Sequence, residues 1–232
     1  MRKRTNTLSL LLLALLLLVC CGFGGCLANA PSLKEEPPSK AAPPATGSDR
    51  LPEQTSSAKQ AKVLIVIAQS SFRDEEYRIP REILEKIGRS VSVGSAKHET
   101  ARGTGGLAVK PDLTLAEARG GDFAAVIFAG GPGAEQYFKD PEAHRLALEA
   151  LNSGGVVGAI CLAPGILAEA GLLEGKKCTA YPSEKQHLLA KGALYSGKDV
   201  VVDGRIVTAN GPQRARAFAD AVVGLLGALV PD

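Results

Sequence analysis

The stretch GAICLAPGILAEAGLL, residues 158–173, contains a short apolar run that ends at Cys161 and continues directly into a helix-forming segment. Pro164 follows the cysteine by three positions, and proline is well tolerated in the first turn of a helix. The pattern therefore predicts a strand, a sharp turn at Cys161 and a helix. Two roles are open to Cys161. It is either a small buried apolar residue, the commonest fate of a free cysteine, or a nucleophile held at the turn.

The segments on either side of this stretch alternate between apolar and amphipathic patterns. Short apolar runs rich in β-branched residues predict buried strands at 63–68, 90–95, 124–131 and 154–160. The segment DVVVDGRIVTAN, residues 199–210, predicts a hairpin that turns at Asp203-Gly204.

Amphipathic segments predict helices at 74–88, 140–151, 162–173 and 213–229. The second of these has Asp140 as its expected N-cap and Pro141 as its first residue. Alternating strands and helices predict an α/β fold, in which helices cover both faces of an open, mostly parallel sheet.

The N-terminus predicts export rather than a folded element. Basic residues 2–4 precede an apolar run at 8–21, in which Ser9 is the one polar residue; the run is shorter than a membrane span and typical of a secretory signal peptide. Two glycines before Cys26 favour lipidation of that cysteine, and ANA, ending at Ala30, offers an alternative cleavage site. We therefore predict a membrane-anchored lipoprotein on the periplasmic or cell-surface side, with a secreted or periplasmic protein as the alternative.

The predicted domain organisation follows from a change in composition. A signal peptide at 1–26 precedes a disordered tether at 27–60 that is rich in Pro, Ser and Ala, and one α/β domain spans 61–232. The net charge is +3, part of it in residues 2–4, aromatic residues make up 4 % of the chain and Trp is absent. Without a basic stripe or aromatic platform we expect no nucleic-acid partner.

Three features are predicted to meet at the carboxyl edge of the sheet, where α/β folds bind ligands. Cys161 ends one strand, GGPG at 130–133 follows another, and three acids at 74–76 follow the first strand. A thiol at a helix N-terminus faces free N–H groups that favour the thiolate, so we expect the pKa of Cys161 to lie below that of a free thiol.

Four stretches resemble the ThiJ/PfpI superfamily: KVLIVIAQSSFRDEEYRIP, VIFAGGPGA, VVGAICLAPGILAEAGLLEGKKCTAYPS and DGRIVTANGP. The resemblance covers residues 61–229 and implies a flavodoxin-like three-layer sandwich that forms a homo-oligomer, a dimer or larger. It also implies that Cys161 lies at a nucleophile elbow and that Glu76 hydrogen-bonds its thiol.

The same resemblance assigns further site residues. The N–H groups of Gly131 and Leu162 are expected to stabilise an oxyanion, and Gly130 and Tyr181 are expected to line the site. Glu76 and Cys161 are expected to share one proton, because two adjacent negative charges repel each other.

The chain departs from the superfamily at its histidines. Leu162 and Tyr181 occupy the two positions where the protease-like branches carry a histidine that assists the nucleophile. His98, His144 and His187 lie in polar or surface-type segments, where solvated side chains are more common than bases. Cysteine proteolysis within one chain is therefore disfavoured, although a neighbouring subunit of an oligomer can contribute residues.

The sequence leaves three functions open. The first is a cysteine-dependent hydrolase or lyase for small reactive carbonyl compounds, similar to a glyoxalase or deglycase. The second is a non-enzymatic sensor or chaperone in which Cys161 is oxidised, and the third is a binding domain without chemistry. Cys178 is expected to be buried and structural, with a Cys161–Cys178 disulfide as the alternative. We expect no cofactor and no metal, since the sequence shows neither a metal-ligand cluster nor a dinucleotide fingerprint.

Overall fold

A seven-stranded sheet forms the centre of the computed structural model, which describes residues 62–227. Its strand order is β11-β12-β8-β7-β1-β3-β6, and every neighbouring pair is parallel except β11 and β12. The strand bounds are β1 Lys62–Val66, β3 Ser90–Ser95, β6 Leu113–Thr114, β7 Ala125–Phe128, β8 Val156–Ile160, β11 Val200–Asp203 and β12 Ile206–Ala209. The predicted signal peptide, Cys26 and the tether lie outside the described residues.

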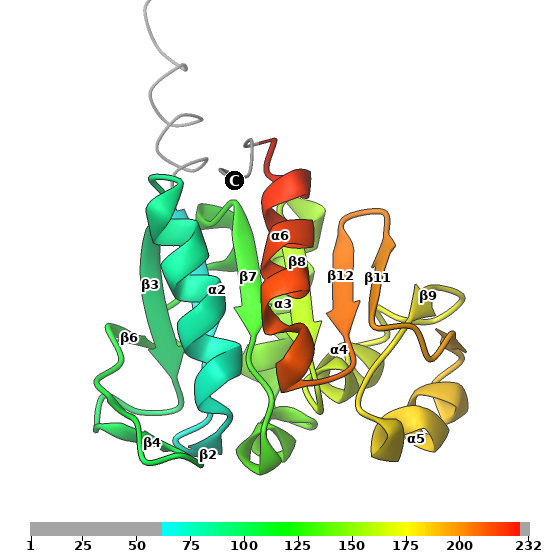
Figure 1. Cartoon of the computed structure of the whole chain (residues 1–232), viewed down its shortest axis with the longest axis horizontal. Helices are drawn as coiled ribbons and strands as arrows, with labels where there is room; N and C mark the ends of the chain where they lie inside the picture. The colour runs from blue at the N-terminus through cyan, green and yellow to red at the C-terminus, as the bar shows by residue number, and fades with distance from the viewer. Residues whose placement is uncertain (1–61, 228–232) are drawn as a thin grey trace, which may run out of the picture. The chain divides into compact units, whose positions relative to one another are not determined.

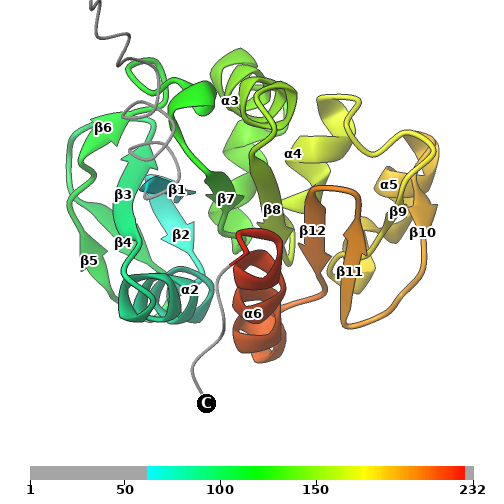
Figure 2. The same ribbon diagram turned by 90° about the horizontal axis from the view of Figure 1, so that it is seen from above.

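Helices cover both faces of this sheet, as Figure 2 shows from above. On one face α2 (Asp74–Lys86) packs beside α6 (Ala215–Leu225), and on the other lie α3 (Pro141–Asn152) and α4 (Pro164–Glu169). All four residues of β7 and all five of β8 are buried, because helices shield these central strands on both sides. The fold is therefore the predicted flavodoxin-like three-layer α/β sandwich.

Local signals in the sequence account for several element boundaries. The side chain of Asp140 accepts hydrogen bonds from the N–H groups of Glu142 and Ala143, which caps α3 as predicted. The predicted hairpin is confirmed as the antiparallel pair β11 and β12, in which Asp203 pairs with Ile206.

Several short elements were not predicted. A small sheet contains β2 (Ser70–Phe72), β4 (Ala101–Gly103) and β5 (Ala108–Val109), and another pairs β9 (Lys177–Cys178) with β10 (Leu194–Tyr195). The six-residue helix α5 (Lys185–Ala190) was also missed. Segments of two to six residues are too short to show a hydrophobic period, so tertiary contacts decide their conformation.

Cys161 and Cys178 are both buried free thiols. The predicted alternative of a disulfide between them is therefore not what the structure contains, and Cys178 fits its interpretation as a buried structural residue. Among residues 62–227, no helix combines the length and apolar character that crossing a bilayer requires.

Candidate functional site

The predicted site residues meet at the carboxyl edge of the parallel strands, which is the lower edge of the sheet in Figure 1. Cys161 directly follows β8, and Gly130 and Gly131 lie two and three residues after β7. Glu76 lies in the first turn of α2, beyond β1 and β2. These three segments are far apart in the sequence and are brought together by the order β8-β7-β1 in the sheet.

The backbone of Cys161 forms a strained turn. Its φ is +63°, a left-handed conformation that costs a non-glycine residue about 1–2 kcal/mol. Two hydrogen bonds hold this conformation: the N–H of Cys161 donates to the carbonyl of Ala209 at 2.9 Å, and its carbonyl accepts from the N–H of Tyr181 at 2.8 Å. The sharp strand-to-helix turn is as predicted, and strain of this kind concentrates at functional sites.

Glu76 is fully buried beside this turn. Its Oε2 accepts a hydrogen bond from the N–H of Gly130 at 2.9 Å. Its other oxygen, Oε1, is buried with no hydrogen-bonding nitrogen or oxygen near it in the described part of the chain. Burial therefore raises the pKa of Glu76 from 4.5 to about 7, although interactions with the Cys161 thiol, the Gly130 N–H and the charge of Arg73 oppose the shift.

The pKa of Cys161 shifts in the opposite direction to the one predicted. Only 5 % of the residue is exposed, and burial followed by the charge of Glu76 raises the thiol pKa from 9.0 to about 12. The N–H groups of Gly131 and Leu162 hydrogen-bond the sulfur and lower its pKa, as the sequence led us to expect. Burial and the charge of Glu76 outweigh their effect. The sequence does not show how deeply the thiol is buried, so it predicted the wrong direction for this pKa.

Close packing at Gly130 and Gly131 leaves no room for a side chain. A Cβ at position 130 would lie 2.7 Å from Oε2 of Glu76 and 2.8 Å from Cβ of Cys161. Gly131 has a φ of +95°, and a Cβ there would lie 2.5 Å from the carbonyl oxygen of Ser71. The GGPG turn therefore lies in direct contact with both Glu76 and Cys161. An ordinary surface turn needs glycine for its backbone conformation alone and has no such contacts.

A pocket of about 350 Å³ opens at Cys161. Its lining residues are Arg73, Gly131, Pro132, Cys161, Leu162, Tyr181, Ser183, Pro212 and Gln213. Gly131, Leu162 and Tyr181 were predicted to belong to the site. Gly130 was predicted to line the site as well, but it is not among the lining residues. The lining residues that were not predicted are Arg73, Pro132, Ser183, Pro212 and Gln213. For Arg73 the only signal in the sequence was its position three residues before Glu76.

No histidine is paired with Cys161 in the described structure. Nε2 of His98 lies 3.0 Å from the carboxylate of Glu117, and Nε2 of His144 lies 2.8 Å from the carbonyl oxygen of Phe138. His187 sits between Glu184 and Glu169, at 2.9 and 2.8 Å. All three rings are thus engaged elsewhere, which agrees with their interpretation as non-catalytic residues.

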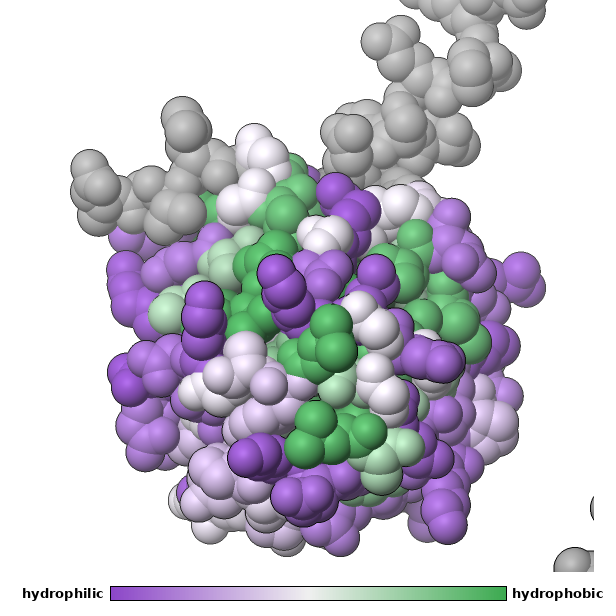
Figure 3. Space-filling view, turned by 90° about the vertical axis from the view of Figure 1, so that its right-hand side faces the viewer, coloured by the Kyte–Doolittle hydropathy of each residue, from purple (hydrophilic) through white to green (hydrophobic). Residues whose placement is uncertain are grey.

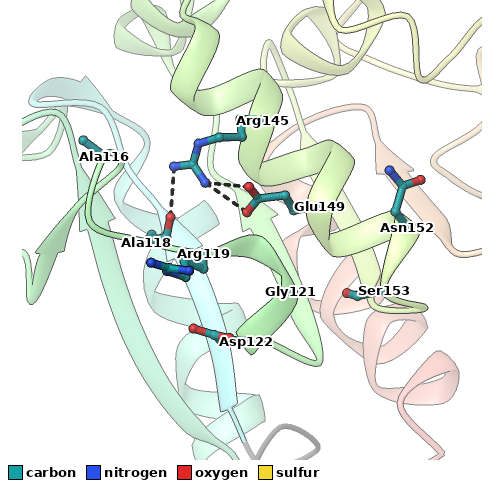
Figure 4. A pocket seen from close by; sticks show the side chains of 9 residues that line it. All are labelled: Ala116, Ala118, Arg119, Gly121, Asp122, Arg145, Glu149, Asn152 and Ser153. Atoms are coloured by element: carbon teal, nitrogen blue, oxygen red, sulfur yellow. Dashed lines mark hydrogen bonds and ion pairs between the residues drawn. The ribbon is translucent and has the colours of Figure 1, made fainter.

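A larger pocket of about 650 Å³ lies between η1 (Gly120–Asp122) and α3, and it shares no residue with the Cys161 pocket (Figure 4). Its central guanidinium, that of Arg145, is already neutralised by Glu142 and Glu149 and also donates to the carbonyl oxygens of Leu115 and Ala118. The guanidinium of Arg145 is therefore not available to a ligand in this pocket. Within residues 62–227, no cluster of three or more His, Cys, Asp or Glu side chains has the geometry to hold a metal ion.

Comparisons with known proteins find several relatives of this chain. An uncharacterized protein of Methanocaldococcus jannaschii is 38 % identical over 72 % of this chain and 82 % of its own length. A Pyrococcus horikoshii protein named as a deglycase is 33 % identical over 71 % of this chain and 99 % of its own length. A Bacillus subtilis protein named as a putative cysteine protease is 31 % identical over 68 % of this chain and 94 % of its own length.

A solved structure supports the same assignment. The ThiJ/PfpI domain protein of Brachyspira murdochii is 35 % identical, with a TM-score of 0.71 over 73 % of this chain and 98 % of that one. The model of the DJ-1/PfpI family matches residues 61–225, which is most of the chain. The chain belongs to the DJ-1/PfpI family.

Proposed function

We propose that this protein is a cysteine-dependent hydrolase or lyase that acts on small reactive carbonyl compounds or their adducts, as a glyoxalase or deglycase does. One observation carries the proposal: Cys161 lies on a strained turn that lines a pocket, next to the fully buried carboxyl of Glu76. The Pyrococcus relative named as a deglycase supports the same class.

In the proposed reaction the sulfur of Cys161 adds to the carbonyl carbon of the substrate. A carbon–sulfur bond forms, the thiol proton passes to Glu76, and the carbonyl oxygen takes up the electron pair before it is protonated in turn. The N–H groups of Gly131 and Leu162, which lie beside the sulfur, are placed to stabilise that oxyanion. A carboxyl with a pKa of about 7 can both accept and return a proton near neutral pH.

Turnover of methylglyoxal tests the proposal. The wild type should consume it, Cys161→Ala should be inactive, and Glu76→Gln should lose at least about 100-fold in turnover, the usual contribution of a positioned acid–base group. Cys178→Ala is the matched control, since it removes the other described thiol without touching the pocket. Consumption by Cys161→Ala at the wild-type rate would refute the role of the thiol.

A second candidate is an oxidative-stress sensor, in which peroxide converts Cys161 to a sulfinate held by a protonated Glu76. The raised pKa of Glu76 favours this arrangement, because a protonated carboxyl can donate to an anionic sulfur group. Intact mass after mild peroxide treatment distinguishes this candidate: a stable gain of two oxygen atoms at Cys161, with no carbonyl turnover, would favour the sensor. A peptidase is disfavoured, because no described histidine pairs with Cys161.

We also propose that the chain is exported and anchored by a lipid on Cys26. The support is the sequence pattern of residues 1–30. The native protein should partition into detergent, and Cys26→Ser should release it or block its processing. A mature N-terminus at Pro31 would show cleavage after Ala30 instead.

A homo-oligomer remains a further proposal. Figure 3 shows the side of the domain that carries β11, β9 and α5. Hydrophobic residues lie among the hydrophilic ones on this surface. Exposed apolar residues from these elements and β10 are Leu189, Leu194 and Val202. Replacing Leu194 by Lys should reduce the mass measured by light scattering if this side joins two copies, and an unchanged mass would place the contact elsewhere.

A further inference from the structure

The side chain of Arg73 brings a positive charge to the pocket around Cys161, and the proposed reaction assigns it no role. Arg73 precedes α2, and its N–H donates to the carbonyl of Gly130 at 2.9 Å, which fixes the residue against the GGPG turn. Its half-buried side chain lines the pocket together with Cys161. No acidic side chain contributes to that lining in the part of the chain that the structure describes.

Two neighbouring acids, Asp74 and Glu76, accept hydrogen bonds from backbone N–H groups rather than from this guanidinium. Oδ2 of Asp74 accepts from the N–H of Gly105, and Oε2 of Glu76 accepts from the N–H of Gly130. Nε of Arg73 is buried with no hydrogen-bond partner in the described structure, where Arg73 also forms no ion pair. A buried donor without a partner is costly, so a hydrogen-bond acceptor that reached this guanidinium would gain a contact that the protein itself does not satisfy.

We infer that Arg73 binds the carboxylate of an anionic carbonyl substrate, so that the pocket prefers 2-oxo acids and related compounds over neutral carbonyls. A guanidinium matches a carboxylate in shape and charge, and this pairing is stronger than a neutral hydrogen bond. The carbonyl beside that carboxylate would then lie over the sulfur of Cys161. This inference rests on the proposed function, since it names the substrate class of the same site.

Two alkylating reagents test Arg73 without requiring turnover. Iodoacetate and iodoacetamide both react with a thiolate, forming a carbon–sulfur bond and releasing iodide, but only iodoacetate carries a carboxylate. The rate of each at Cys161 is measured on the full-length protein, by mass spectrometry of the peptide that contains Cys161. We expect Arg73→Gln to lower the ratio of the iodoacetate rate to the iodoacetamide rate about tenfold, and Arg73→Lys to retain part of it.

The ratio separates substrate binding from an indirect effect. Arg73 also lowers the pKa of Glu76 through its charge, but a change in the thiolate population alters both reagent rates equally and cancels in the ratio. Arg78→Gln is the matched control, because it removes the same charge from the exposed side of α2, where Arg78 pairs with Glu82. An unchanged ratio in Arg73→Gln, an equal fall in Arg78→Gln, or no alkylation of Cys161 by either reagent would overturn the inference.

Protection experiments address the carbonyl class itself. The concentration of glyoxylate needed to protect Cys161 from iodoacetamide should rise about tenfold in Arg73→Gln. The concentration of glyoxal needed for the same protection should not change. The inference requires this result as well as the fall in the ratio of the two alkylation rates. Its failure is distinguishable from failure of the proposed function. If methylglyoxal turnover requires Cys161 but Arg73→Gln leaves the ratio of the two alkylation rates unchanged, only the inference about Arg73 is wrong. If Arg73→Gln changes both the ratio and the protection by glyoxylate, but the wild type turns over no carbonyl compound, only the catalytic proposal is wrong.

Discussion

Glu76 accepts a hydrogen bond from the N–H of Gly130 at 2.9 Å, although the two residues lie 54 positions apart in the sequence. The bond fixes the acid of α2 to the turn that follows β7, and Cys161, directly after β8, packs against the same glycine. Acid, turn and thiol therefore form one buried unit. Moving any of the three changes the electrostatic environment of the others.

The thiol should become easier to ionise when the acid is removed. The negative charge of Glu76 and its hydrogen bond with the thiol both raise the pKa of Cys161, so Glu76→Gln should lower it, and burial should still hold it above the ordinary value. The measurement is the pH dependence of the iodoacetamide rate at the Cys161 peptide. Glu82→Gln, on the exposed side of α2, should leave the profile unchanged. A midpoint that rises in Glu76→Gln would contradict this account.

Glu76→Gln should also stabilise the fold at alkaline pH. The folded state holds a proton on Glu76 up to about pH 7, whereas the unfolded chain releases it near 4.5. Stability therefore falls as the pH rises through this window, by about 3 kcal/mol at most. Thermal unfolding should show a gain in Tm over the wild type that is larger at pH 8 than at pH 5. An equal gain at both pH values would mean that the carboxyl is not the cause.

The two glycine substitutions Gly131→Ala and Gly88→Ala separate backbone strain from steric overlap. Both positions have positive φ, +95° and +80°, but only at position 131 would a Cβ meet other atoms, the nearest being the Ser71 carbonyl oxygen at 2.5 Å. Urea unfolding should show a loss of about 1 kcal/mol for Gly88→Ala and at least about 3 kcal/mol for Gly131→Ala. Equal losses would show that the turn moves freely away from Ser71.

His187 should make stability depend on pH near neutrality. Burial lowers its pKa, but hydrogen bonds to Glu184 and Glu169 and their charges outweigh burial and leave the pKa above 6.5. A raised histidine pKa stabilises the fold fully below the unfolded value, and this contribution is lost as the pH rises through the folded value. His187→Gln should therefore lower Tm by several degrees at pH 6 and by less at pH 8.5. His98→Gln, which removes an exposed ion pair with Glu117, serves as the control and should change Tm little.

The fold could be predicted because its central strands are continuous apolar runs. Residues 125–128 and 156–160 have no polar side chain, so their burial on both faces is evident from the sequence alone. The same logic fails for β9 and β10, two residues each, whose pairing depends on contacts between distant segments.

The position of the site was predictable, and so was the direction of the Glu76 pKa shift, because a proton shared with the thiol implies a raised carboxyl pKa; the thiol pKa was not. The resemblance indicated Cys161 and Glu76, and the structure brings them together as expected. The thiol pKa was predicted in the wrong direction, because helix-end N–H groups are visible in a sequence pattern while desolvation is not. Arg73 was overlooked for a related reason, since an arginine among acids normally suggests ion pairs, and this one forms none within residues 62–227.

The hydrogen bond from Cys161 to the carbonyl of Ala209 has a consequence for biosynthesis. The ribosome makes β8 before β12, so the turn at Cys161 lacks this acceptor until nearly the whole domain has been translated. A nascent chain that stops between residues 181 and 209 can form the hydrogen bond from Tyr181 to the Cys161 carbonyl, but not the one from the Cys161 N–H to Ala209. The turn at Cys161 therefore gains both of its backbone hydrogen bonds only after residue 209 has been added, late in the synthesis of the domain.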